Sequence, residues 1–431
     1  MQVMLIEFSV GNYRSFKERV TFSMVAANIV AKDKELDENN VFAVDKELKL
    51  LKSAAIYGAN ASGKSNLAKA LSFMRWFMVN SSRETQSTDP IDVEPFRLST
   101  ETEDKPSYFE LVFLMDGKRY RYGFEANQEQ VISEWLYYVP KVRETKLFER
   151  KINSFKISKS YEASGIQKRT RDNALFLSVS AQFNVGFAEE ILGWVISKLG
   201  MISELWEPLL FTYTIDCLMN NENKSDIVKL IKKLDLGIDD IQVEKGNFTN
   251  DIVNDNLTDR VKHLTLEIRR GQTASIKTIH KKFDKNGNDQ SIEKFDFRSH
   301  ESEGTQKLFT LAGTLIKTLK EGDILVVDEL DARLHPLITT AIVSLFNSKE
   351  ANPNNAQLIF MTHDTNLLSN KLFRRDQIWF TEKNRYGATD LYSLAEYKIR
   401  NDASFESDYI KGKYGAIPYI GDLSHLVDSH V

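Results

Sequence analysis

Gly58-Ala59-Asn60-Ala61-Ser62-Gly63-Lys64-Ser65 is the stretch of this 431-residue chain that decides its fold. It fits the pattern Gly, four residues, Gly-Lys-Ser/Thr, in which backbone N–H groups surround a phosphate, the lysine neutralises phosphate oxygens and the hydroxyl binds Mg²⁺. An apolar run from Leu50 to Tyr57 precedes it, and apolar residues recur at helical spacing over 66–79. We therefore expect a buried strand, a phosphate-binding loop and a helix whose positive end faces the phosphate.

A second cluster lies far along the chain, where the apolar stretch 323–327 ends in Asp328 and Glu329. Asp328 would join the Mg²⁺ shell, and Glu329 would orient or deprotonate an attacking water. Strands often end in exposed acids, so this signal is weak alone. Combined with the glycine loop, it predicts a site that hydrolyses a nucleotide.

Two more features have both a functional and a plain structural interpretation. The apolar stretch 357–362 ends in His363, where a γ-phosphate sensor would lie in a parallel sheet, although a loop histidine could equally cap the next helix. Ser302-Glu303-Gly304-Thr305-Gln306 opens a predicted helix. Such a helix start can bind a phosphate supplied by another subunit, and it can also be an ordinary capping sequence.

Composition excludes several classes of protein. Hydrophobic residues make up 42% and charged residues 27%, as in ordinary globular proteins, and no apolar run approaches the length of a membrane span. Residues 1–8 read as a strand and not as a signal peptide, so a cytoplasmic location is expected. Cys217 is the one cysteine, which excludes intramolecular disulfides. The net charge of −4 provides no global attraction to nucleic acid, and the basic stretches 151–171 and 398–413 are better explained as solvated faces.

The pattern of elements predicts an α/β fold with a mainly parallel sheet interrupted by an insertion. Strand patterns near the N-terminus, including a hairpin over 108–124 with a turn at Asp116-Gly117, add an antiparallel β portion. We expect residues 1–140 to form the first part of an ATPase head and 296–431 to complete it. Residues 141–295 would form a mixed, largely helical insertion or lid, which lacks the heptads of a coiled coil.

Together these residues resemble the ABC-type ATPase heads of the SMC, RecF and OLD group. The loop Gly58 to Asn66 and the opening Phe8 to Phe16 have the form found in that group. Four further stretches resemble the stand-alone ATPases of bacterial abortive-infection systems, of the AbiL/RloA type: Pro95 to Leu98, Tyr120 to Phe124, Glu301 to Gln306 and Lys413 to Pro418.

The resemblance implies a role for each matching residue toward ATP and Mg²⁺. Lys64 and Ser65 would bind phosphate and metal, Asp328 would bind the metal, Glu329 would be the catalytic acid and His363 the switch histidine. The other nucleotide-binding residues would be Gly58, Asn60, Ala61, Ser62, Gly63 and Asn66, with Arg14 beside them. Gly304 and Gln306 would complete the nucleotide site of a partner subunit, and Asp331 would lie at the dimer seam. Glu303 departs from the usual serine, and we assign no glutamine loop.

Three functions follow from this. The first is a nucleotide-gated ATPase in antiviral defence, forming an ATP-dependent homodimer or higher oligomer and acting with a separate effector such as a nuclease, without a membrane partner. No nuclease is expected in the chain itself, because the late carboxylates Asp376, Glu382, Asp390 and Glu396 are spread apart. The alternative is a RecF-like DNA-repair ATPase that closes on DNA, which leaves nucleic-acid binding open. A scaffold that binds ATP without hydrolysis is disfavoured by the intact Lys64, Asp328 and Glu329.

Overall fold

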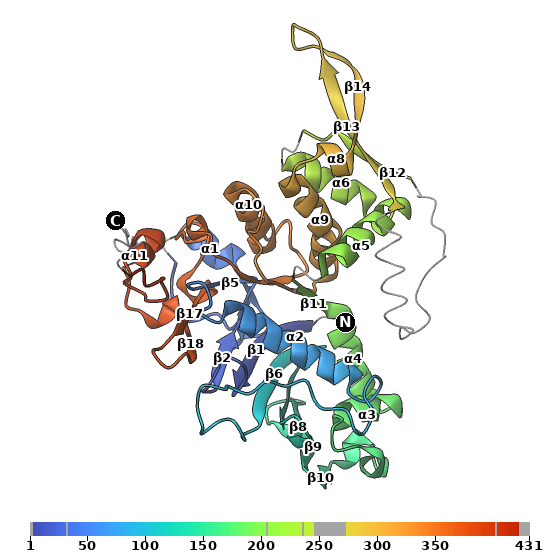
Figure 1. Ribbon diagram of the computed structural model, residues 1–431, viewed down its shortest axis with the longest axis vertical. Helices are drawn as coiled ribbons and strands as arrows, with labels where there is room; N and C mark the ends of the chain where they lie inside the picture. The colour runs from blue at the N-terminus through green and yellow to red at the C-terminus, as the bar shows by residue number, and fades with distance from the viewer. Residues whose placement is uncertain are drawn as a thin grey trace, which may run out of the picture.

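The computed structural model describes residues 3–31, 33–203, 206–234, 237–244, 273–400 and 403–421. A six-stranded sheet lies at its centre, a seven-stranded sheet lies beside it, and a three-stranded arm projects away from both (Figure 1). The α/β class and the N-terminal antiparallel sheet predicted from the sequence are confirmed. Within these residues no helix combines the length and apolar character that crossing a membrane requires.

The central sheet is mainly parallel. Its strand order is β11 (Leu199–Ile202), β15 (Ile324–Val327), β16 (Gln357–Met361), β5 (Ser53–Tyr57), β17 (Ile378–Lys383) and β18 (Thr389–Ser393), and only β18 runs antiparallel to its neighbour. Every residue of β5, β15 and β16 is buried. Continuous apolar runs are expected for parallel strands that are covered on both faces.

Two apolar cores share this sheet. On β5, Ala54 and Ile56 face one core while Ala55 and Tyr57 face the other, as the two-residue period of a strand requires. The first core is filled by α2 (Lys64–Asn80), α3 (Phe176–Gln182) and α4 (Gly186–Lys198). The second is filled by α5 (Glu207–Met219), α6 (Lys224–Lys233), α9 (Glu303–Glu321), α10 (Pro336–Asn347) and α11 (Phe405–Ile410).

The seven-stranded sheet is antiparallel throughout. Its order is β10 (Ser154–Ile157), β9 (Thr145–Lys151), β8 (Val131–Val139), β7 (Lys118–Ala126), β6 (Ser107–Met115), β1 (Val3–Gly11) and β2 (Val20–Ser23). The predicted turn at Asp116-Gly117 is confirmed, since Met115 pairs with Lys118 and both turn residues have positive φ. One face packs on α2, where the ring centroids of Phe109 and Phe73 lie 5.1 Å apart.

The apolar run predicted as one strand before the glycine loop is split. The run from Leu50 to Tyr57 forms β4 (Lys49–Leu51), which pairs with β3 (Val41–Ala43), and then β5 of the central sheet. The chain changes sheets at Lys52, whose backbone N–H bonds to Asn40 and whose carbonyl accepts from Leu358. Later in the chain, β9 and β10 form a hairpin, whose turn includes Ile152 with a left-handed φ of 52°.

The segment 141–295 contributes strands to both large sheets. Its β9 and β10 extend the seven-stranded sheet, and its β11 forms an edge of the central sheet. The arm consists of β12 (Asp240–Glu244), β13 (Ser275–Phe283) and β14 (Asp289–Asp296), followed by α8 (Phe297–His300). Residues 245–272 lie outside the described residues, and the domain boundaries at 140 and 295 stay a prediction.

Candidate nucleotide site

The glycine loop joins β5 to α2 and is held by the last strands of the central sheet. Gly58 and Gly63 have φ of 156° and 118°, and a Cβ added to either would lie 2.4 Å from an atom of Thr381 or Thr389. The hydroxyls of Ser62 and Thr381 share a hydrogen bond of 2.6 Å, and the Thr389 hydroxyl donates to the Ser62 carbonyl at 2.7 Å. The loop therefore requires glycine at both positions to approach β17 and β18 this closely.

A cavity of about 490 Å³ opens above this loop. Loop residues surround it, together with side chains just after β15 and β16 and at the end of β17. Its lining consists of Asn60, Ala61, Ser62, Gly63, Lys64, Ser65, Asn66, Glu329, His363 and Lys383. Nine of these ten residues, all except Lys383, are ones that the sequence identified, and they meet because the parallel strands end at the same edge of the sheet.

Lys64 is buried at the base of the cavity. Its Nζ donates to the Gly58 carbonyl at 2.7 Å and to the Ala59 carbonyl at 3.1 Å. Burial lowers the pKa of Lys64 to about 8, against the opposing charges of Asp328, Glu329 and Asp331. The backbone acceptors keep the amine inside the loop, where a phosphate would restore a strong preference for its charged form.

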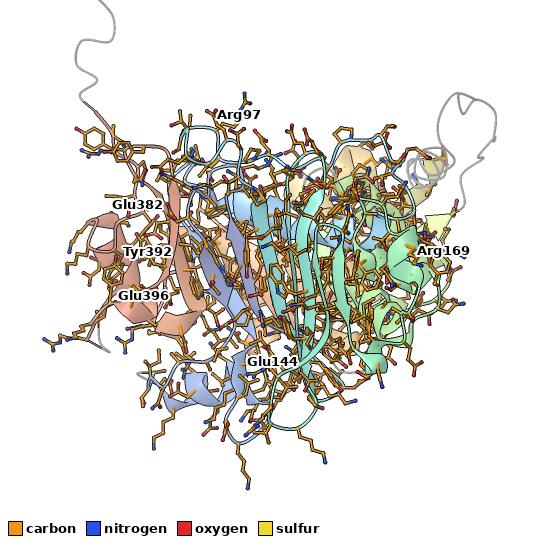
Figure 2. The ribbon with its side chains drawn as sticks, turned by 90° about the horizontal axis from the view of Figure 1, so that it is seen from below. Arg97, Glu144, Arg169, Glu382, Tyr392 and Glu396 are labelled. Carbon is orange, nitrogen blue, oxygen red and sulfur yellow. The ribbon has the colours of Figure 1, made fainter. Side chains whose placement is uncertain are left out.

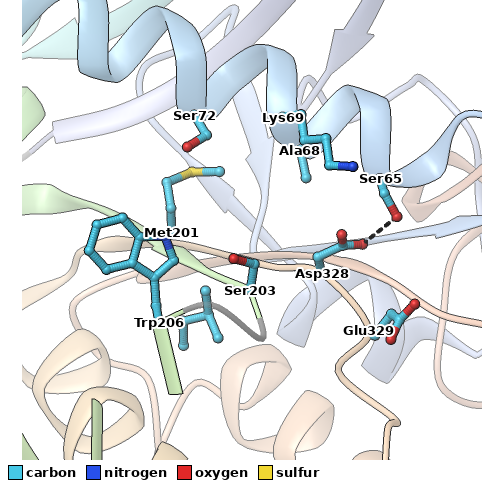
Figure 3. Close-up of a pocket in the computed structure, with 10 residues that line it drawn as sticks. Ser65, Ala68, Lys69, Ser72, Met201, Ser203, Trp206, Asp328 and Glu329 are labelled. Carbon is cyan, nitrogen blue, oxygen red and sulfur yellow. Dashed lines mark hydrogen bonds between the residues drawn. The ribbon is translucent and has the colours of Figure 1, made fainter. Parts of the chain in front are cut away.

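Ser65 and Asp328 form the hydroxyl–carboxylate pair of the site. Ser65 Oγ donates to Asp328 Oδ1 at 3.2 Å, which Figure 3 shows as a dashed line. Ser65 lies in the first turn of α2, and Asp328 follows the last residue of β15, where its N–H bonds to the Ile202 carbonyl of β11. Hydroxyl and carboxylate oxygens are the ligands that Mg²⁺ prefers, so this pair fits the metal predicted from the sequence.

Glu329 and His363 face the same cavity from neighbouring strand ends. Glu329 has a left-handed φ of 57°, which is uncommon for a residue with a side chain. Burial and the charge of Lys64 lower the pKa of His363, while Asp331 and Asp328 oppose this shift. The backbone N–H of His363 donates to Asp331 Oδ2 at 3.3 Å. A neutral imidazole is thus favoured at neutral pH, beside a carboxylate that fixes its backbone.

A second cavity of about 400 Å³ adjoins the Ser65–Asp328 pair on its other side (Figure 3). One wall is α2, through Ala68, Lys69 and Ser72, and the other is the end of β11 and the start of α5. Its remaining lining residues are Ser65, Met201, Ile202, Ser203, Trp206, Asp328 and Glu329. Of the two acids that follow β15, Glu329 therefore lines both cavities, whereas Asp328 lines the second.

Gly58 of the loop and Asp331, described above, line neither cavity, and three further predicted residues also lie outside both linings. Arg14 forms an ion pair with Glu94 at 3.5 Å and donates to the Tyr13 hydroxyl at 3.2 Å. Gly304 and Gln306 lie in the first turn of α9, where the Gln306 side chain donates to the carbonyl of Glu301 at 3.0 Å. A Cβ on Gly304 would lie 2.8 Å from the Arg333 carbonyl. Within one copy of the described chain, these three residues do not meet the loop.

The sequence did not identify the residues that hold the loop from outside. Besides Thr381 and Thr389, Ser15 takes part, because its hydroxyl accepts from the Asn66 side chain at 2.8 Å and its carbonyl accepts from the Thr389 N–H at 2.7 Å. Isolated hydroxyl residues carry no motif, and nothing in their spacing indicates contact with a loop that is 51 residues away for Ser15 and more than 300 for the two threonines. Lys383, Ser203 and Trp206 were missed for the same reason.

The loop at the end of β5 and the two acids after β15, a parallel strand of the same sheet, define an ABC-like P-loop ATPase. A sequence profile described as "AAA domain, putative AbiEii toxin, Type IV TA system" matches residues 53–369. The chain belongs to this AAA_21 family. A search among curated proteins found no match.

Solved structures with a similar course of the chain include two SMC heads and a recombination mediator protein. The SMC head domain from Thermotoga maritima is 14% identical, covering 91% of this chain and 99% of that one at a TM-score of 0.39. The SmcHead bound to the C-winged helix domain of ScpA is 13% identical, covering 90% and 97% at 0.40. The recombination mediator RecF bound to ATP is 13% identical, covering 91% and 99% at 0.36.

Proposed function

We propose that the chain is a Mg²⁺-dependent ATP hydrolase whose nucleotide site is the cavity above the glycine loop. The observation that carries this proposal is the convergence of Lys64, Ser65 and Glu329 around one cavity, with Asp328 hydrogen-bonded to Ser65. Such an arrangement supplies a cation for phosphate, oxygen ligands for a metal and a base for water.

Each residue is given a separate task. The backbone N–H groups of 60–64 and the Lys64 amine bind phosphate oxygens, and the start of α2 adds its positive end. Ser65 and Asp328 hold Mg²⁺, which when bound offsets the charge of the phosphates. Glu329 accepts a proton from the attacking water, and neutral His363 donates a hydrogen bond from its ring toward the terminal phosphate.

We further propose that two copies close on each other when ATP is bound. Gly304 and Gln306 would then complete the nucleotide site of the partner, with Asp331 at the seam and Arg14 near the nucleotide. The close approach of Gly304 to the Arg333 carbonyl supports this, because it ties the start of α9 to the loop that carries Asp331. A bound nucleotide shifts such an equilibrium only through its preference for the closed state.

The biological role that we propose is regulatory: an ATPase of the AbiL/RloA type that works in the cytoplasm with a separate effector, such as a nuclease, in a bacterial abortive-infection system. Its support is the family description, which names a toxin and a type IV toxin–antitoxin system, together with the stretches that resemble such ATPases.

The Glu329→Gln variant tests the chemistry. Loss of the general base predicts a fall in kcat of about 10²- to 10⁴-fold with ATP binding retained, and light scattering of this variant with ATP would reveal the dimer. Hydrolysis at the parental rate would remove Glu329 from its role.

For the biological role, infected cells that carry the chain with its genetic neighbours would be compared with cells that carry the Lys64→Ala variant. Protection that survives this change would contradict an ATP-driven regulator. ATP-dependent, salt-sensitive binding of duplex DNA by the chain alone would instead favour the RecF-like alternative.

A further inference from the structure

Strand β17 brings a lysine to the nucleotide cavity. Lys383 is the last residue of this strand, and it lines the cavity together with the glycine loop. β17 runs parallel to β5, with Phe380 opposite Tyr57, so the residues after Phe380 lie alongside the loop that follows β5. Lys383 also lies beyond residue 369, where the family match ends.

The side chains of β17 alternate between two environments. Thr381 faces the loop, where its hydroxyl meets that of Ser62, and Lys383 lies two residues further on the same face. Glu382 faces the opposite side, where its carboxylate accepts a hydrogen bond from the Tyr392 hydroxyl at 2.9 Å. Figure 2 shows Glu382 and Tyr392 together on these C-terminal strands. The lysine is thereby directed toward the loop.

The neighbour of Lys383 across the hairpin also contacts the loop. Lys383 is paired in register with Thr389, which donates to the Ser62 carbonyl. Two threonines that touch the loop thus flank the lysine. In the part of the chain that the structure describes, no ion pair or hydrogen bond engages the Lys383 side chain, which is exposed. Its amine is available to an anion in the cavity.

We propose that Lys383 binds a phosphate oxygen of the nucleotide, as a second cation beside Lys64. This inference rests on the proposed function. Lys64 reaches phosphate from within the loop, whereas Lys383 reaches it from β17, across the cavity mouth. A charged amine and a phosphate form a strong, salt-sensitive hydrogen bond, and the exposed position makes its strength depend on ionic strength.

The test is titration of the full-length Lys383→Ala chain with ATP and with adenosine, at low and at physiological salt. Arg385→Ala is the matched control, because it removes one exposed cation from the same hairpin outside the cavity. Loss of one charged hydrogen bond predicts ATP affinity about ten- to a hundredfold weaker, with a shallower salt dependence. Adenosine binding should not change, and Lys383→Arg should recover most of the ATP affinity.

Each outcome has a defined meaning. An ATP affinity of Lys383→Ala equal to that of Arg385→Ala, when the parent binds ATP, overturns this inference alone. Equal weakening of ATP and adenosine also overturns it, because it would indicate a general disturbance of the site. No ATP binding by the parent overturns the proposed function and this inference together. Equal thermal midpoints of the variants and parent without ligand would show that the fold is intact.

Discussion

The Ser65 hydroxyl lies 3.2 Å from Asp328 Oδ1, although 263 residues separate them in the chain. The contact joins the first turn of α2 to the end of β15 across the central sheet. It places the two oxygen ligands where a single metal ion can reach both, so substitution of either residue would disturb the metal site.

Asp328→Asn should abolish the increase in ATP affinity that Mg²⁺ produces. The amide removes the negative charge while it keeps the shape of the side chain, so ATP affinity should no longer rise when Mg²⁺ is added, and kcat should fall at least about a hundredfold. Titrations with and without Mg²⁺ measure this. Asp390→Asn, which changes an exposed carboxylate on β18, is the control. A Mg²⁺ effect of parental size in Asp328→Asn would contradict the assigned metal site.

ATP binding should weaken above about pH 8. Burial lowers the pKa of Lys64 to about 8 in the free chain, so the amine loses its charge as the pH rises through that value. If the bound lysine keeps its proton, affinity should fall by about tenfold per pH unit beyond this point. Titrations from pH 7 to 9.5 at constant ionic strength measure it. A Lys64→Arg chain that still binds ATP should show no such decline, because arginine stays charged; the same decline there would rule out Lys64 as its origin.

Thr389→Val should loosen the glycine loop without touching the nucleotide. Valine keeps the shape against Gly63 but cannot donate to the Ser62 carbonyl, so ATP affinity should drop by about tenfold. Thr389→Ser keeps the hydroxyl and should bind ATP nearly as well as the parent. Calorimetric titration compares them, and equal affinities of the valine and serine variants would refute the positioning role.

Lys52→Met should stabilise the fold at neutral pH. Lys52 is 1% exposed, and among the described residues its amine has one distant acceptor, the Ser348 carbonyl at 3.4 Å. Burial and then the charge of Lys349 lower the pKa of Lys52 to about 8. Since the unfolded chain holds this proton more tightly, charging the buried amine costs roughly 2–3 kcal/mol at pH 7.

The sign of this effect can be measured directly. Parental stability should rise between about pH 8 and 10.5, as the buried amine becomes neutral, relative to that of Lys52→Met, which lacks the titrating group. Urea unfolding across this range gives both the gain at pH 7 and its disappearance at high pH. Lys49→Met, an exposed change on β4, should have little effect. A loss of stability in Lys52→Met would show that the amine is better solvated than its burial indicates.

The sequence alone determined the local elements whose signals are contiguous. The glycine loop, the strand before it and the helix after it follow from residues that are neighbours in the chain, and so do the acids that end β15. Because parallel strands present their carboxyl ends at one edge, it also determined that these segments meet. The family match to residues 53–369 agrees with this part of the prediction.

Tertiary structure alone decided what surrounds that loop. Ser15, Thr381 and Thr389 hold it through single hydroxyls and backbone groups, and such contacts have no signature because each residue type is common and each partner is remote in sequence. Lys383 reaches the cavity only because β17 inserts beside β5. The order of strands in a sheet is set by packing of the whole chain, and this order decides which side chains share a cavity.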